Sequence, residues 1–238
     1  MILVIGNIGN EAASSLVEAF ELGAASFVTA SNLHETFKAA IAVNDFGSSA
    51  LTIGKHRLSP SQISSVITTV AYFIPEEFYY VEASDREYVC AEVSAFFVYF
   101  LSELRCRKLN PPTSRSLSGL GMHRIEWMKA ACGLGIPVWA PQHEKGMPTE
   151  ATGGPDFVRA TFVRATIVGD AVVEKDVPAE VCGFLRVLSR KLGMPYLCGD
   201  FAMRTTGQYL LANLWSVPDI SSPANREAMV RFLNGTHA

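Results

Sequence analysis

Two glycines near the start of the chain are the first residues whose type and spacing suit chemistry. Gly6-Asn7-Ile8-Gly9 follows a short apolar run, and glycines at such a turn let a backbone approach a phosphate group. The dinucleotide-binding pattern also needs a third glycine and an acidic residue after a second strand, and both are missing. The motif therefore favours a plain strand-to-helix turn over a nucleotide-binding loop.

The other reactive residue types form no recognisable constellation. The five histidines do not pair at metal-ligand spacing, and the five cysteines stand far apart without a Cys-x-x-Cys pair. The cysteine pattern indicates neither a zinc site nor a disulfide framework, and it suits small core thiols in a reducing compartment. Ser116-Leu117-Ser118-Gly119 lacks the strand–turn–helix setting of a nucleophile elbow, so nothing points to a hydrolase triad.

The composition is that of an ordinary globular protein. The 238 residues are 49% hydrophobic and 18% charged, with a net charge of -3. The basic residues are scattered, which disfavours nucleic acid as a partner. The longest apolar stretch, 93–101, is far shorter than the ~20 residues that span a bilayer, and the N-terminus lacks the basic region of a secretory signal. We therefore expect a cytoplasmic protein that binds neither nucleic acid nor a membrane.

The first half of the chain predicts a small α/β lobe. Residues 2–5 are fully apolar, which is typical of a buried strand, and Leu16, Val17 and Phe20 recur at helical spacing. Further β-type runs stand at 27–29, 51–53 and 67–73. A long helix follows from Asp85, because apolar residues recur at intervals of three and four. We interpret the aromatic stripe of this helix as core packing, because nothing polar converges on it.

The second half predicts another α/β unit with an antiparallel sheet. A helix is expected over 124–134, and the residues rich in proline and glycine from 140 to 155 indicate a linker or surface loop. The predicted strands are 157–168, 171–173, 197–203 and 208–215, with helices from Pro178 to Gly193 and from Ser222 to Gly235. We therefore divide the chain into an N-terminal α/β lobe with hinge helix (1–139), a linker (140–156) and a C-terminal lobe (157–238).

Part of this pattern resembles a known family. Asn110-Pro111-Pro112, Arg124 and Gly135-Ile136-Pro137 resemble the hinge region of the ATP-grasp superfamily, in its glutathione-synthetase and ribosomal-protein glutamate-ligase branch. In that family an asparagine after a strand precedes a helix that begins with lysine and ends in Gly-Ile. Arg124 stands at the lysine position. The lysine reaches the nucleotide phosphates, and arginine keeps the charge without the point-donor geometry.

A longer stretch resembles the end of the ATP-grasp core. Residues 163–170 match a strand that carries an arginine into Val-Val-Gly-Asp, and Leu192-Gly193 matches the end of the next helix. Asp200, Gly207 and Pro218 then fall into register without gaps. The resemblance implies an α/β (α+β) fold, in which a small pre-ATP-grasp-like lobe precedes a truncated ATP-grasp-like lobe with an antiparallel sheet.

The departures from the family pattern concern the parts that bind ATP and magnesium. Asn213 stands where the family has a magnesium-binding glutamate, and Trp215 where it has the second ligand, asparagine. An amide and an indole do not supply the anionic oxygens that a hard cation needs. Between the two matching segments the family inserts a nucleotide-binding subdomain, whereas here only 140–156 fills the interval, with Lys145 as its lysine. The resemblance therefore implies a degenerate member that lacks this subdomain.

Our hypothesis is a non-catalytic, accessory ATP-grasp-like protein of a biosynthetic or peptide-modification pathway, without cofactor, metal ligands or catalytic residues. A partner protein or small carboxylate ligand would bind in the cleft between the lobes, since arginines bind carboxylates through paired hydrogen bonds and an indole offers a stacking surface. The residues expected to line this vestigial cleft are Arg115, Arg124, Arg159, Arg164, Asp200, Asn213 and Trp215.

Two alternatives to an accessory protein stay open. One is an ATP-dependent carboxylate–amine ligase that uses ATP and Mg2+, either alone or completed by another subunit. The other is a purely structural subunit. For each cleft residue, the competing interpretation is a solvated charge or, for Trp215, a packed indole. The sequence also leaves homo-oligomerisation open.

Overall fold

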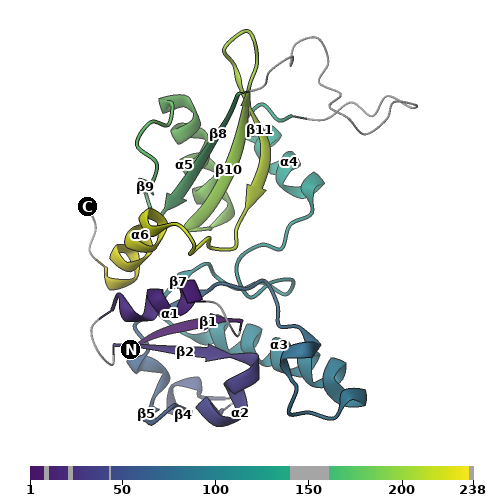
Figure 1. The fold of residues 1–238 in the computed structure, drawn as a ribbon, viewed down its shortest axis with the longest axis vertical. Helices are drawn as coiled ribbons and strands as arrows, with labels where there is room; N and C mark the ends of the chain where they lie inside the picture. The colour runs from purple at the N-terminus through teal and green to yellow at the C-terminus, as the bar shows by residue number, and fades with distance from the viewer. Residues whose placement is uncertain (8–10, 21–23, 43, 140–160, 236–238) are drawn as a thin grey trace.

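The computed structural model describes residues 1–7, 11–20, 24–42, 44–139 and 161–235. Figure 1 shows a lower part built on a parallel sheet and an upper part built on an antiparallel sheet. The predicted fold class, α/β (α+β) with an antiparallel sheet in the C-terminal lobe, is confirmed. In the parts of the chain described here, no helix is long and apolar enough to cross a membrane.

The N-terminal sheet is parallel, and its central strand is apolar because both of its faces are buried. Its strand order is β2 (Ala25–Thr29), β1 (Ile2–Gly6), β6 (Ser65–Thr68) and β7 (Arg107–Leu109). Leu3 and Ile5 of β1 pack into one core cluster, and Ile2 and Val4 into another. Such continuous apolar runs are typical of parallel strands covered on both sides.

Smaller elements complete this lobe. They are α1 (Glu11–Glu18), α2 (Leu33–Thr36) and a three-stranded antiparallel sheet of β3 (Phe37–Ala40), β4 (Ala50–Ile53) and β5 (His56–Leu58). Short 3-10 turns lie at Ala30–Asn32, Phe46–Ser48, Pro60–Gln62, Pro75–Glu77 and Ala83–Asp85. The strand predicted over 67–73 was too long, since β6 ends at Thr68. Phe73 instead turns into the core, where its ring lies 5.5 Å from that of Phe97.

The long helix α3 (Arg86–Glu103) supplies the aromatic half of the N-terminal core. Phe97, Phe100 and Leu101 are fully buried, and the Phe37 ring of β3 lies 5.2 Å from Phe97 and 5.6 Å from Phe100. The prediction that this stripe is core packing is confirmed.

The C-terminal sheet is antiparallel, and one of its faces is covered by a helix. Its strand order is β11 (Tyr209–Trp215), β10 (Tyr196–Met203), β8 (Thr161–Val168) and β9 (Ala171–Val172). Ala165 and Ile167 of β8 pack with Leu185 and Leu188 of α5 (Ala179–Leu192). Residues of β8 with the opposite parity therefore face the other side of the sheet.

The hinge helix α4 (Arg124–Gly133) packs with this C-terminal sheet. Trp127, Ala131 and Ile136 share one buried cluster with β8, β10 and α5. Residues 140–156, where we predicted the boundary between the lobes, lie outside the described residues, so the division stays a prediction.

The two lobes share a continuous apolar core. Ile2, Val4 and Leu16 of the first lobe belong to the same buried cluster as Met229 and Leu233 of α6 (Pro223–Asn234). This last helix also touches β6, β7 and β8, and in Figure 1 it lies between the two sheets. Shared burial of this kind holds the two lobes together.

Asn110 adds a polar connection at the same interface. Its side chain is 2% exposed, and its Nδ2 donates to the carbonyl oxygens of Tyr196 (2.9 Å) and Ser216 (2.6 Å). Its Oδ1 accepts from the backbone N–H of Tyr196 at 2.7 Å. One side chain at the end of β7 therefore holds the start of β10 and the residue that follows β11.

We predict that Asn110→Ala lowers the free energy of unfolding by about 3 kcal/mol, because it leaves buried backbone groups of Tyr196 and Ser216 without their partner. Urea denaturation measures the change. Asn44, which is exposed, provides the matched control, and its replacement by alanine should cost less than about 0.5 kcal/mol. Equal effects of the two substitutions would contradict the role of Asn110.

Two glycines of α5 give a second, paired prediction. Gly193 ends the helix with φ 64°, while Gly183 lies inside it, and a Cβ at either position meets nothing within 4 Å. Gly193→Ala should therefore lower stability by about 1 kcal/mol through backbone strain alone. Gly183→Ala should raise it by about 0.5–1 kcal/mol, since alanine favours the helix. Thermal unfolding tests the two opposite signs, and a shared sign would contradict this account of the helix end.

Candidate functional site

Three of the predicted cleft residues form one row across the C-terminal sheet. Arg164 of β8 is the register partner of Asp200 of β10, and Asp200 is the partner of Asn213 of β11. Register partners place their side chains on the same face of a sheet, here the face opposite α5. Trp215 stands two residues beyond Asn213 and pairs with Cys198. Four candidates thus meet on one open face.

The charges of this row are already paired. The Arg164 Nε donates to Asp200 Oδ1 at 2.8 Å, and Nη2 donates to Oδ2 at 3.1 Å. The guanidinium also lies over the Trp215 ring, 5.2 Å from its centroid. Hydrogen bonds from Arg164 to the Asp200 carboxylate raise the pKa of the guanidinium. Because the Arg164 side chain is 61% exposed, solvent weakens the pair energetically.

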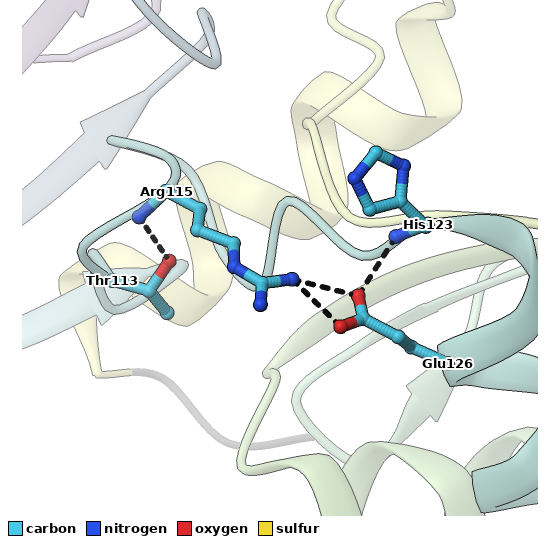
Figure 2. Close-up of polar contacts among 4 residues, drawn as sticks. All are labelled: Thr113, Arg115, His123 and Glu126. Carbon is cyan, nitrogen blue, oxygen red and sulfur yellow. Dashed lines mark hydrogen bonds and ion pairs between the residues drawn. The ribbon is translucent and has the colours of Figure 1, made fainter.

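Arg115 lies in the hinge segment, where it joins the start of α4 to the loop that precedes it. Figure 2 shows its Nη1 between the two oxygens of Glu126, at 2.7 and 2.9 Å. Glu126 also accepts from the backbone N–H of His123 at 2.9 Å. The hydrogen bond from Arg115, followed by that from His123, holds the pKa of the Glu126 carboxyl below its usual range. In this structure Arg115 is a hinge residue.

The remaining arginines do not join the row. Arg124 is the first residue of α4, and its Nη2 donates to the carbonyl oxygen of Trp139 at 3.0 Å. That contact ties the helix start to the segment that pairs with β11 through Val138 and Leu211. Arg159 lies outside the described residues.

A small apolar hollow connects the open face to the hinge. Its volume is about 170 Å3, and Trp215 lines it together with Leu120, Met122 and Trp127. Sequence reasoning missed these last three residues. Trp127 lies in a segment that we predicted only as a helix, and Leu120 and Met122 lie in one that we predicted only as turns. None of the three was assigned to a binding surface. Their apolar character inside a turn-rich stretch was the available signal.

The donor set of the row does not fit the magnesium ion that the family resemblance implies. The carboxylate of Asp200 is engaged by Arg164 through both oxygens, and the neighbouring groups are the amide of Asn213 and the indole of Trp215. Mg2+ needs several oxygen ligands, usually with carboxylates among them, in octahedral geometry.

Comparison with solved structures identifies the fold. The macrocyclase MdnC from Microcystis aeruginosa MRC, solved with the precursor peptide MdnA, matches with a TM-score of 0.72 at 13% identity, over 100% of both chains. A Chryseobacterium gregarium RiPP-associated ATP-grasp ligase, solved with ADP and a leader and core peptide, matches with 0.69 at 13% identity, over 100% of this chain and 97% of that one. The ATP-grasp ligase PsnB, solved with precursor peptide PsnA2 and AMPPNP, matches with 0.68 at 13% identity, over 98% and 97%.

Sequence comparison adds nothing to this result. No protein-family model and no curated protein matches the chain. At 13% identity the structural likeness speaks for the fold alone. This chain has the fold of the ATP-grasp ligases.

Proposed function

We propose that this chain is an accessory protein with an ATP-grasp fold, which binds a partner peptide or a small carboxylate ligand in a peptide-modification pathway. The observation that carries the proposal is the Arg164–Asp200 pair. Beside Asn213, which stands where the resemblance implies a magnesium ligand, the Asp200 carboxylate is bonded through both oxygens to the Arg164 guanidinium. Acyl phosphate formation needs ATP, metal and acid held in line, and this arrangement does not favour it.

The pathway is inferred from the similar structures. MdnC and PsnB were each solved with a precursor peptide, and the Chryseobacterium gregarium ligase with a leader and core peptide. The likeness in fold extends along the entire chain. A protein that kept this fold while losing the metal ligands would most simply keep a role in holding a peptide.

The open face of the C-terminal sheet offers a carboxylate site. A guanidinium has five N–H donors. Asp200 accepts from only two of them, the N–H of Nε and one N–H of Nη2. Within the described residues, no acceptor is bonded to Nη1 of Arg164. The ring of Trp215 backs the guanidinium and limits its motion. A ligand carboxylate would therefore bind at Nη1 without breaking the existing pair.

A second candidate function is an ATP-dependent carboxylate–amine ligase, active alone or completed by another subunit. The observation that favours it is the coverage of ligase structures, which reaches 100% of both chains for MdnC. Residues 140–156, where the resemblance would place the nucleotide-binding subdomain, lie outside the described residues. ATP binding separates the two functions.

Isothermal titration calorimetry with ATP, in the presence and absence of magnesium, makes that separation. For an accessory protein we expect no magnesium-dependent heat, because an amide and an indole stand where metal ligands are needed. Micromolar binding that requires magnesium would overturn the accessory proposal in favour of a ligase, and ligase assays would then follow.

Carboxylate recognition is tested with a short capped peptide that carries one glutamate. Trp215 reports binding through the chemical shift of its indole N–H, and Arg164→Met should weaken the affinity about tenfold, the value of one charge-assisted hydrogen bond. Arg190→Met is the matched control, since Arg190 also pairs with an aspartate, Asp170, on the same lobe. Equal affinity of the wild type and Arg164→Met would contradict the site. Equal affinity of the wild type for the glutamate peptide and for its glutamine counterpart would contradict it as well.

A further inference from the structure

A second hollow lies in the N-terminal lobe, away from the row on the C-terminal sheet. Its volume is about 390 Å3, and it lies between α3, the segment that follows β6 and the hinge loop. Ala91, Ala95 and Val98 of α3 supply an apolar wall, opposite Leu117 of the hinge loop. This volume falls within the ~300–1,000 Å3 typical of ligand pockets.

Exposed tyrosines border this hollow. Tyr72 lines it and is 64% exposed, and Tyr88 is 69% exposed. Ala91 lines the hollow, and Tyr88 lies one turn before it on the same face of α3, because residues three and four apart share a helix face. Such rings are not needed for the core, since Phe97 and Phe100 fill it from the other side of α3. Accessible ring faces of this kind attract cations.

The same region carries a strong net negative charge. Residues 74–103 contain seven carboxylates and one basic residue, a net charge of -6, whereas the whole chain has -3. Glu87 stands four residues before Ala91, on the same face of α3. The rest of the chain is accordingly net positive, so this region differs in sign from the rest.

The nearby cations of the protein are already engaged. Arg86, the basic residue of this stretch, donates through Nε and Nη2 to the carbonyl oxygens of Val81 and Tyr79. Arg115, which also lines the hollow, is paired with Glu126. Within the described residues, no ion pair engages Glu87 or Glu92, so their charge is available to a ligand.

We propose that the surface formed by Tyr72, Glu87, Tyr88, Ala91 and Ala95 docks a cationic peptide segment. The aliphatic stem of an arginine or lysine would lie against the alanine wall, as long basic side chains commonly do on apolar surfaces. Its charged head would meet the ring faces and the Glu87 carboxylate. The inference goes beyond the proposed function, because this surface acts independently of Arg164.

The test uses a fluorescent, acetylated and amidated octapeptide of alternating arginine and glycine, titrated with the full chain at 0.15 M salt. Fluorescence anisotropy gives the dissociation constant. Ala91→Trp, at an exposed position, fills the hollow, and Glu87→Lys reverses the charge beside it. Each of the two substitutions should raise the dissociation constant at least about tenfold, which corresponds to the loss of roughly one strong contact.

Glu103→Lys is the control for general electrostatics. It makes the same charge change on α3, but about 24 Å along the helix from Glu87 at ~1.5 Å per residue, which exceeds the screening length of about 8 Å at this salt concentration. It should change affinity less than about twofold. Arg164→Met should bind the cationic peptide with the affinity of the wild type. A negative result for the docking surface is therefore distinguishable from a negative result for the carboxylate site at Arg164.

Three outcomes overturn the inference. Equal losses in Glu87→Lys and Glu103→Lys would show unspecific attraction, and unchanged binding in both Ala91→Trp and Glu87→Lys would place the peptide elsewhere. Concentration-dependent dimers in sedimentation velocity that Ala91→Trp abolishes would show that the surface holds a second copy of this chain. A loss confined to the two surface variants, with melting temperatures near the wild type, supports the docking surface.

Discussion

The structure depends on one buried side chain that joins its two lobes. Asn110, at the end of β7, makes three hydrogen bonds to the backbone around Tyr196 and Ser216. Apolar packing alone is not directional, so the shared core beneath α1 and α6 would tolerate small shifts between the lobes. Directional hydrogen bonds in a buried interface oppose such shifts, because a shift would leave buried polar groups unpaired and lower the stability of the fold. Asn110 thereby sets where the C-terminal sheet stands relative to the hinge.

That position determines the chemistry of the open sheet face. With β10 and β11 fixed by the hinge, Trp215 reaches both the apolar hollow and the guanidinium of Arg164. The face carries an ion pair and an indole, a combination suited to holding an anionic group of a ligand.

Charge is distributed unevenly between the two surfaces. Residues 74–103, which include the acidic, tyrosine-bearing side of α3, have a net charge of -6, although the net charge of the chain is only -3. On the open face of the C-terminal sheet, by contrast, Arg164 and Asp200 are paired. The net charge of the chain conceals the acidic region because the residues outside 74–103 are net positive. Peptides that become ordered on binding have a low affinity per unit of buried area. A peptide that contacted both proposed surfaces would gain affinity from the additional contacts.

The sequence by itself determined the elements and the fold class, because periodicity, glycine caps and apolar runs are local properties of the chain. The buried strand at the N-terminus, the aromatic core of α3 and the hairpin before Ala171 are examples. The resemblance to the ATP-grasp superfamily placed Arg164, Asp200, Asn213 and Trp215 in one cleft with Arg115, Arg124 and Arg159. The structure brings the first four together on one sheet face. Only the tertiary structure decided that Arg164 pairs with Asp200 and that Arg115 pairs with Glu126. It also decided that Tyr72 and Trp127 line hollows. Those contacts join residues from separate elements, whose relative placement depends on packing and on Asn110, and no local pattern encodes it.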